Sequence, residues 1–141
     1  MIPRILIVGS TGKLGTMLLK YTKKNGISVY ASTCFSNTKK IKSQKSLYGI
    51  KKTFVLSDSD EKEKFLKILK SKINIIYFLD YGSSSLYYLD IFLKFNQNSL
   101  IAIANKEMII AGGHLLRNKI LKSKNNLVPL DSEHFSLFRL R

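Results

Sequence analysis

Several residue types are rare in this sequence of 141 residues, and each shortage excludes a class of protein. A single cysteine, Cys34, cannot close a disulfide within the chain, so a disulfide-stapled secreted scaffold is excluded. One cysteine and two histidines are also too few to build a closed zinc site. No run approaches the roughly 18 apolar residues that cross a bilayer, and the short run 5–8 leads into a glycine turn instead of a signal-peptide cleavage site. The sequence therefore predicts a single-domain cytoplasmic protein without membrane association.

Acidic residues are scarce as well. Nine Asp and Glu stand against 24 Lys and Arg, which gives a net charge of +15, and residues 1–57 contain no acid. Most of the basic residues are lysine, and the lysine-rich codons of an AT-rich genome account for much of the excess. The functional alternative is a surface that attracts phosphates, nucleotides or nucleic acid. Because the sequence shows no alternation of basic and aromatic residues, a nucleic acid partner is not expected.

Short apolar runs alternate with segments of helical hydrophobic spacing along the whole chain. Strands are predicted at 4–8, 27–31, 53–56, 73–79, 100–104 and 127–130, and helices at 13–24, 38–47, 60–72, 83–95 and 106–122. This alternation indicates βαβ units around a parallel sheet. We therefore predict an α/β fold with a Rossmann-like parallel sheet and helices on both faces.

Three glycines at intervals of three residues follow the first predicted strand, in Gly9-Ser-Thr-Gly-Lys-Leu-Gly15. Gly9 permits a tight turn, Gly12 lets a diphosphate approach the backbone, and Gly15 lets the helix pack closely on the sheet. The free N–H groups at the helix start then face the phosphates, and Ser10 and Thr11 can add hydroxyl donors. The alternative is a capped helix and a tight turn without a ligand.

The segment after the second predicted strand has no carboxylate, which an NAD site normally places there for the ribose 2′-hydroxyl. It offers instead the hydrogen-bonding residues Ser32, Thr33, Ser36 and Asn37 and the cations Lys39 and Lys40. This set would accept a 2′-phosphate, so the sequence favours NADPH over NADH. For Lys39 and Lys40 the alternative is that they only coat a solvent-exposed helix.

Asn105, Lys106 and Glu107 follow the fifth predicted strand, at the sheet edge where open α/β sheets bind ligands. An amide, an ammonium and a carboxylate in succession can bind a nicotinamide amide and an anionic oxygen. The alternative is a simple helix start, with Asn105 as the N-cap and Glu107 in the first turn.

Asp131 and Glu133 follow the last predicted strand, on either side of Ser132. In an extended segment residues i and i+2 point the same way, so the two carboxylates could share one Mg²⁺ or Mn²⁺ ion. Two carboxylates do not complete a site, and a third ligand is needed. The alternative is a helix cap by Asp131 or Ser132.

Three motifs, at 9–15, 104–107 and 129–134, together resemble one enzyme family in their order and spacing. The chain is similar along its whole length to the N-terminal region of the 1-deoxy-D-xylulose 5-phosphate reductoisomerases, whose members are much longer. The resemblance implies an NADPH-dependent and metal-dependent rearrangement and reduction of 1-deoxy-D-xylulose 5-phosphate to 2-C-methyl-D-erythritol 4-phosphate, a step of isoprenoid precursor synthesis. It also implies a homodimer for a full-length form.

The resemblance assigns site residues position by position. It implies cofactor contacts at Thr11, Gly12, Lys13, Leu14, Ser36, Asn37, Asn105 and Glu107, substrate contacts at the catalytic residues Lys106 and Ser132, and metal ligands at Asp131 and Glu133. Three positions depart from the family pattern. Lys13 stands where the family has Ser, Phe35 stands where it has Gly, and the segment 79–86 has one glycine and a carboxylate where the family has a glycine-rich turn.

The resemblance also divides the chain into two parts. Residues 1–130 correspond to an NADPH-binding Rossmann-like domain, and residues 131–141 to the start of a catalytic domain that binds metal and substrate. The third metal ligand and the substrate-phosphate residues would follow Arg141 in the family. We therefore expect this chain to be inactive alone. The alternative function is a non-catalytic, dinucleotide-binding Rossmann module.

Overall fold

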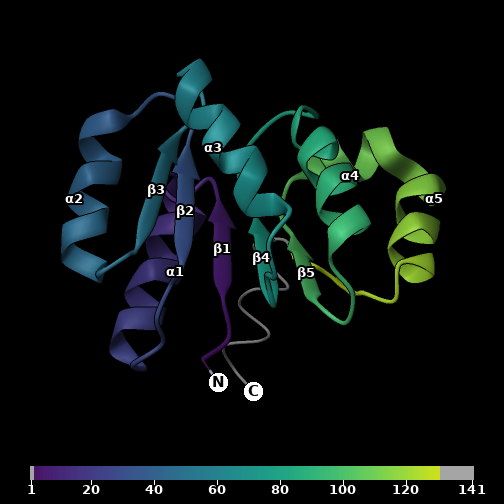
Figure 1. Ribbon diagram of the computed structural model, residues 1–141, viewed down its shortest axis with the longest axis horizontal. Helices are drawn as coiled ribbons and strands as arrows, with labels where there is room; N and C mark the ends of the chain where they lie inside the picture. The colour runs from purple at the N-terminus through teal and green to yellow at the C-terminus, as the bar shows by residue number, and fades with distance from the viewer. Residues whose placement is uncertain (1, 131–141) are drawn as a thin grey trace.

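The computed structural model describes residues 2–130, which form a parallel sheet of six strands in the order β3-β2-β1-β4-β5-β6, with five helices between them (Figure 1). The strands are β1 (Ile5–Val8), β2 (Ala31–Cys34), β3 (Lys52–Val55), β4 (Ile75–Phe78), β5 (Leu100–Ile103) and β6 (Asn126–Pro129). The helices are α1 (Lys13–Lys24), α2 (Thr38–Tyr48), α3 (Ser59–Leu69), α4 (Ser85–Phe95) and α5 (Lys106–Lys122). The expected Rossmann-like α/β fold is confirmed.

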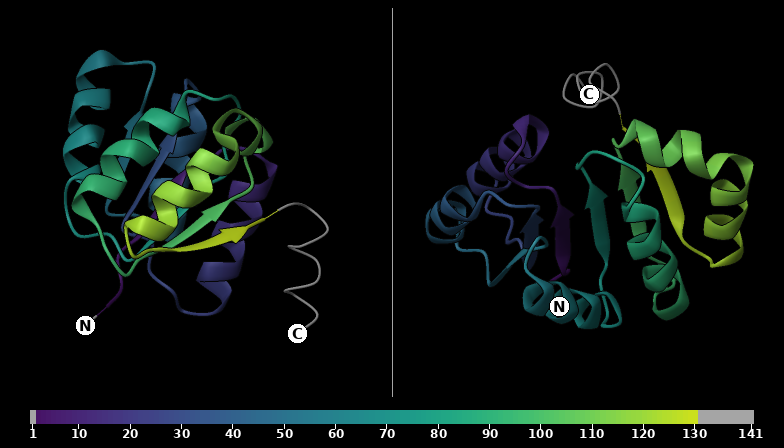
Figure 2. Two further views of the ribbon diagram at one scale, coloured as in Figure 1. Left: turned by 90° about the vertical axis from the view of Figure 1, so that its right-hand side faces the viewer. Right: turned by 90° about the horizontal axis from the view of Figure 1, so that it is seen from above.

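Two hydrophobic cores, one on each face, hold the sheet between its helices. In the buried strand β1, Leu6 and Val8 point into the core shared with α3, α4 and α5, whereas Ile5 and Ile7 point into the core shared with α1. Successive side chains of a strand point to opposite faces, so a strand covered on both sides is apolar throughout. The two further views in Figure 2 show helices on both sides of the sheet.

The second strand lies later in the sequence than its hydrophobicity predicts. Gly26, at φ 67°, ends α1, and the exposed Ile27 donates its N–H to Thr22 O instead of entering the sheet. The strand is Ala31–Cys34, and all four of its residues are buried. The prediction of 27–31 was wrong because β2 is made of small, mostly polar residues and not of the branched apolar residues that usually mark a buried strand.

Other boundaries differ by a few residues. α3 ends at Leu69 instead of residue 72, and α5 is kinked at Gly113, where φ is 51° and ψ is −142°. α2 is more than a solvent-exposed helix, because Ile41 and Gln44 on its inner face are buried. None of the helices that the structure describes is long and apolar enough to cross a membrane.

Candidate functional site

The glycine turn lies where the chain changes direction in the sheet. β1 is flanked by β2 on one side and by β4 on the other, so the connections that leave β1 and β4 diverge at their carboxyl ends. A Cβ on Gly9, which has φ +91°, would lie 2.7 Å from the backbone nitrogen of Asp80. A Cβ on Gly15 would lie 2.5 Å from Gly9 O and from Ser10 backbone atoms. Both positions therefore require glycine, as the sequence predicts.

The middle glycine differs from the other two because the space beside it is empty of protein atoms. A Cβ on Gly12 would meet nothing within 4 Å, and Gly12 is the N-cap of α1 without a side-chain hydrogen bond to the helix. No acidic residue lies in the first turn of α1. An uncapped helix start carries unpaired N–H groups and a partial positive charge, which suits an anion.

Ser10 does not add a donor to this turn, in contrast to the sequence-based expectation. Its side chain is fully buried, its Oγ donates to Gln44 Oε1 at 2.8 Å, and Gln44 Nε2 donates to Ser10 O at 2.9 Å. The pair ties α2 to the turn. Gln44 gave no signal in the sequence, because it lies in a lysine-rich helix that looks solvent-exposed. Thr11 stays half-buried and Lys13 is exposed at the helix start.

The carboxyl end of β2 lies beside the turn and carries no acid. Thr33 Oγ1 accepts a hydrogen bond from Gly9 N at 3.2 Å, so this side chain fixes the turn itself. Ser36 and Asn37 are exposed, and Asn37 caps α2 by accepting from Lys40 N at 3.2 Å. Lys39 and Lys40 are exposed in the first turn of α2. The set has hydroxyl, amide and ammonium groups with which a phosphate can interact.

A partly buried carboxylate joins the loops after β4 and β5. Asp80 accepts hydrogen bonds from the Ser85 hydroxyl and from Asn105 Nδ2, the latter at 3.3 Å. Asn105 Nδ2 also donates to Gly82 O at 2.7 Å, while its Oδ1 accepts from Met108 N at 3.1 Å and caps α5. Asp80 is thereby held by the loops that follow β4 and β5. Sequence reasoning found Asn105 but not this network, since its members lie far apart in the chain.

Comparison with known proteins agrees with this geometry. No family model matches the sequence. The 1-deoxy-D-xylulose 5-phosphate reductoisomerase of Pelagibacter ubique is 34% identical over 159 aligned positions, which cover 97% of this chain, and that of Helicobacter pylori is 31% identical over 150 positions, which cover 96%. The chain is a relative of the 1-deoxy-D-xylulose 5-phosphate reductoisomerases, matched over their N-terminal region.

Solved reductoisomerases share the fold of this chain. The enzyme of Zymomonas mobilis, solved with NADPH, matches 99% of this chain with a TM-score of 0.79 and 19% sequence identity. The matched part makes up 41% of that enzyme's chain. A reductoisomerase solved with magnesium has a TM-score of 0.78 over 95% of this chain at 19% identity. The chain spans about two fifths of the curated reductoisomerases it matches, 40% and 39% of the two named above.

The structure brings together some of the residues that the reductoisomerase resemblance implies. Lys106 and Glu107 are exposed in the first turn of α5, beside the buried Asn105 that caps the same helix. The helix-start interpretation of Asn105 is therefore correct, and its cofactor contact stays a prediction. Asp131, Ser132 and Glu133 lie outside the described residues. Within residues 2–130 no group of three His, Cys, Asp or Glu side chains could hold a metal ion.

The Asp80 carboxyl gives a test by pH. Burial raises its pKa above the ordinary value of 3.8, the hydrogen bonds from Ser85 and Asn105 oppose this, and the charge of Glu107 adds to it. The folded state therefore keeps this proton to higher pH than the unfolded state does. The protonated Asp80 carboxyl therefore contributes fully to stability below its pKa in the unfolded state. This contribution is lost as the pH rises through its pKa in the folded state.

We therefore expect Asp80→Asn to be more stable than the unaltered chain at pH 7, by on the order of 1 kcal/mol, with no gain at pH 4. An asparagine can still accept from Asn105 Nδ2 on its Oδ1, can donate from its Nδ2 to the Ser85 hydroxyl in place of the bond that Asp80 accepts, and removes the cost of the partly buried charge. Thermal unfolding between pH 4 and pH 8 measures the difference. The control Asp90→Asn changes an exposed, surface-paired carboxylate and should shift stability by less than about 0.5 kcal/mol at any pH. A loss of stability in Asp80→Asn at pH 7 would contradict the assignment.

Proposed function

We propose that this chain is the NADPH-binding part of a 1-deoxy-D-xylulose 5-phosphate reductoisomerase, which forms 2-C-methyl-D-erythritol 4-phosphate with Mg²⁺ or Mn²⁺. The observation that carries the proposal is the uncapped start of α1, with open space beside Gly12, at the point where the connections of β1 and β4 diverge. This is where open α/β sheets bind dinucleotides. The choice of reaction follows from the similarity of the chain to reductoisomerases.

The cofactor's diphosphate would lie against the backbone of Gly12 and the N–H groups at the start of α1, near Thr11, Lys13 and Leu14. No side-chain cap occupies these N–H groups, and a Cβ on Gly12 would meet no atom within 4 Å, which supports a diphosphate at this place. When bound, NADPH supplies the hydride, and the protein positions it.

The adenosine end of the cofactor would lie at the carboxyl end of β2. Ser36 and Asn37 would hydrogen-bond the ribose and its 2′-phosphate, and Lys39 and Lys40 would neutralise the phosphate. The observation that favours a 2′-phosphate is the absence of any acid from residues 1–57, which include the loop after β2; the acids nearest in the sequence, Asp58, Asp60 and Glu61, follow the neighbouring strand β3. The exposed ring of Phe35, 74% accessible, offers a face on which the adenine can stack.

The nicotinamide end would lie between the loops after β4 and β5. Asn105 and Glu107 would contact the cofactor there, and Lys106, exposed at the start of α5, would hold the substrate. Asp131 and Glu133 would bind the divalent metal, with Ser132 on the substrate, and the metal would act as a Lewis acid on substrate oxygens. Because two carboxylates leave the metal site incomplete, we expect no turnover by this chain alone. The homodimer and the cytoplasmic location also stay predictions.

The 2′-phosphate assignment is tested by reversing two charges. We expect the double variant Lys39→Glu, Lys40→Glu to bind NADPH about 10-fold more weakly, with little change for NADH, because the variant loses two cations only near the 2′-phosphate. Cofactor fluorescence measures both dissociation constants. The control Lys62→Glu, Lys64→Glu makes the same change of charge on exposed positions of α3 and should leave both constants within about 2-fold. Equal weakening for NADPH and NADH would contradict the assignment.

A further inference from the structure

Acidic residues in this protein are unevenly distributed between the two edges of the sheet, whereas cations lie at both. Six of the seven acids in the described residues lie in the loops or the N-terminal halves of the helices that follow the strands; they are Asp58, Asp60, Glu61, Glu63, Asp80 and Glu107. The amino edge is formed by the helix C-termini and the segments that enter the strands. Besides Lys45, Lys67 and Lys119 in the last turns of α2, α3 and α5, it carries ten exposed cations that are here called the amino-edge basic face: Arg4, Lys23, Lys24, Lys51, Lys52, Lys70, Lys72, Lys94, Lys122 and Lys124.

Few of these cations are neutralised. The described part of the chain contains one ion pair, Lys119 with Asp90 at 3.4 Å, and neither partner is among the ten. Lysines at helix C-termini offset the helix dipole, which accounts for some of them. It does not account for Arg4, Lys51, Lys52, Lys72 and Lys124, which lie in the segments between the helices and the strands or at the strand start.

Aromatic rings lie among these cations. Arg4 lies over the ring of Tyr30, with its Cζ 4.5 Å from the ring centroid, and Lys52 Nζ lies 5.9 Å from the same centroid. Lys70 Nζ lies 5.8 Å from the centroid of Phe95, whose side chain is 54% exposed. Each contact joins segments that are far apart in the sequence. The alternation of basic and aromatic residues that the sequence lacks is therefore present on the folded surface.

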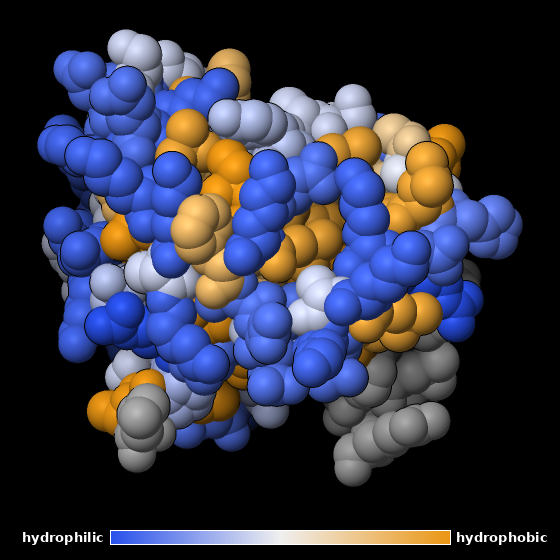
Figure 3. Space-filling model, turned by 45° about the vertical axis from the view of Figure 1, so that its right-hand side comes forward, coloured by the Kyte–Doolittle hydropathy of each residue, from blue (hydrophilic) through white to orange (hydrophobic). Residues whose placement is uncertain are grey.

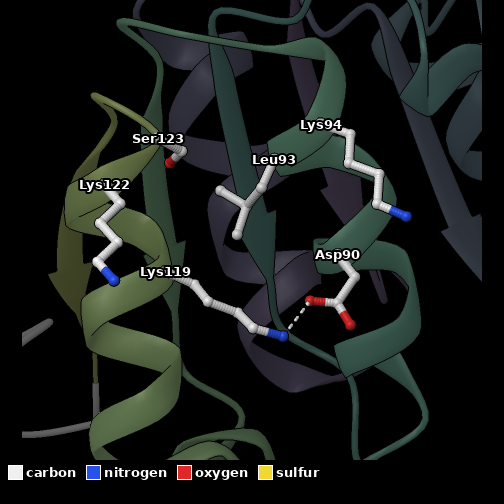
Figure 4. A pocket seen from close by; sticks show the side chains of 6 residues that line it. All are labelled: Asp90, Leu93, Lys94, Lys119, Lys122 and Ser123. Atoms are coloured by element: carbon white, nitrogen blue, oxygen red, sulfur yellow. Dashed lines mark hydrogen bonds and ion pairs between the residues drawn. The ribbon is translucent and has the colours of Figure 1, made fainter.

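A groove opens between the C-terminal halves of α4 and α5, and Phe95, which follows Lys94 in α4, is not among the residues that line it. Its volume is about 460 Å³, and it is lined by Asp90, Leu93, Lys94, Lys119, Lys122 and Ser123 (Figure 4). Lys119 points toward Asp90, while Lys94 and Lys122 make no ion pair in the described structure. In Figure 3, which brings this side of the molecule forward, hydrophobic side chains lie among hydrophilic ones. The groove thus combines apolar surface with unpaired positive charge.

Buried amides make the loops of this edge rigid. Asn96 accepts from Ile73 N at 2.9 Å and donates to Ser71 O at 3.1 Å, so it joins α4 to the loop that carries Lys70 and Lys72. Asn125 accepts from Ser99 N at 2.8 Å and donates to Asn96 O at 2.9 Å. The cations therefore project from fixed segments, and less ordering cost opposes binding than in a flexible lysine-rich tail.

We propose that the amino-edge basic face binds single-stranded nucleic acid. Phosphates would interact with Lys94, Lys122 and the neighbouring lysines, and bases would stack on Phe95. Unpaired cations along a hydrogen-bonded edge, with the exposed ring of Phe95 and the partly buried ring of Tyr30 among them, match the combination that holds single strands without sequence preference. The face lies at the opposite edge of the sheet from the glycine turn, so this activity is independent of NADPH binding and does not rest on the proposed enzymatic function.

The test is fluorescence anisotropy with a labelled 12-nucleotide oligouridine, the full chain and 50 to 200 mM NaCl. For about three phosphate contacts, the dissociation constant should rise about 20-fold over this range.

The double variant Lys94→Glu, Lys122→Glu should bind at least 10-fold more weakly with a smaller salt dependence. Phe95→Ala should also bind about 5-fold or more weakly but keep the salt dependence, because stacking is not ionic. The control Lys62→Glu, Lys64→Glu carries the same change of charge at the carboxyl edge and should stay within about 2-fold.

Three results would overturn the proposal. One is an oligouridine affinity that Lys94→Glu, Lys122→Glu and the control weaken equally, since net charge alone would then explain binding. Another is an oligouridine affinity of Phe95→Ala equal to that of the unaltered chain, which would contradict the stacking of bases on Phe95. The third is binding to vesicles containing phosphatidylglycerol without binding to the oligonucleotide, which would assign the face to membranes. NADPH should not displace the oligonucleotide, and the circular dichroism spectrum and melting temperature of each variant show that it is folded, so either function can fail alone.

Discussion

The free energy of unfolding of the Gly15→Ala variant is expected to be at least about 3 kcal/mol lower than that of the unaltered chain. This is on the order of the largest effects of overpacking. The new methyl group would lie 2.5 Å from Gly9 O and from Ser10 Cα and O, which are backbone atoms of the turn that holds α1 against the sheet. Backbone atoms cannot rotate away as a side chain can. The clash outweighs the roughly 1 kcal/mol by which alanine favours a helix over glycine. Denaturant unfolding followed by circular dichroism gives the free energy.

Gly12→Ala is the matched control, because it adds the same methyl group three residues earlier. No atom lies within 4 Å of that position, and its φ of −77° suits any residue. The free energy of unfolding should change by less than about 1 kcal/mol. Equal free energies of unfolding for Gly15→Ala and Gly12→Ala would contradict the close contact between α1 and the backbone of the turn.

The Gly12→Asp variant is expected to bind NADPH at least 100-fold more weakly, or about 2.7 kcal/mol, while its stability is unchanged or higher. A carboxylate at the start of α1 would occupy the place proposed for the diphosphate and repel it. The same carboxylate can accept hydrogen bonds from the free N–H groups of the helix, and aspartate is among the best N-cap residues, worth a few tenths of a kcal/mol (~0.3) over glycine.

Opposite effects on affinity and stability distinguish a ligand site from a merely structural turn. Melting temperature and NADPH affinity should be measured on the same preparation, with Gly12→Asn as the uncharged control. Asparagine caps a helix equally well but does not repel phosphate, so its loss of affinity should be smaller than that of aspartate. Unchanged NADPH affinity in Gly12→Asp would place the cofactor elsewhere.

The sequence predicted the central part of the fold and its glycine turn from local patterns. β1, β4 and β5 are branched apolar runs because both their faces are buried, and such runs are recognisable without a structure. β2 was misplaced because its residues Ala31–Cys34 are small and mostly polar, although all are buried. Their burial follows from the helices packed above them, and no local pattern expresses that.

The contacts within the site were less predictable than its location. Spacing identified Gly9, Gly12 and Gly15, since a phosphate turn is a local arrangement. It did not show that Ser10 is held by Gln44, or that Asp80 is held by Ser85 and Asn105. The cation–aromatic pairs of the amino edge were missed for the same reason. Such pairs depend on which loops the sheet order brings together, and that order is a property of the whole chain.

The most direct test of the proposed function is calorimetric titration of the unaltered chain with NADPH and with NADH. The site described above predicts one NADPH bound per chain, with a dissociation constant at least 10-fold lower than that for NADH. This factor corresponds to about 1.4 kcal/mol from the 2′-phosphate. NADH binding as tight as NADPH binding would contradict the assignment of Ser36, Asn37 and the lysines after them. Binding of neither nucleotide would contradict the claim that the Gly9–Gly15 turn holds a dinucleotide.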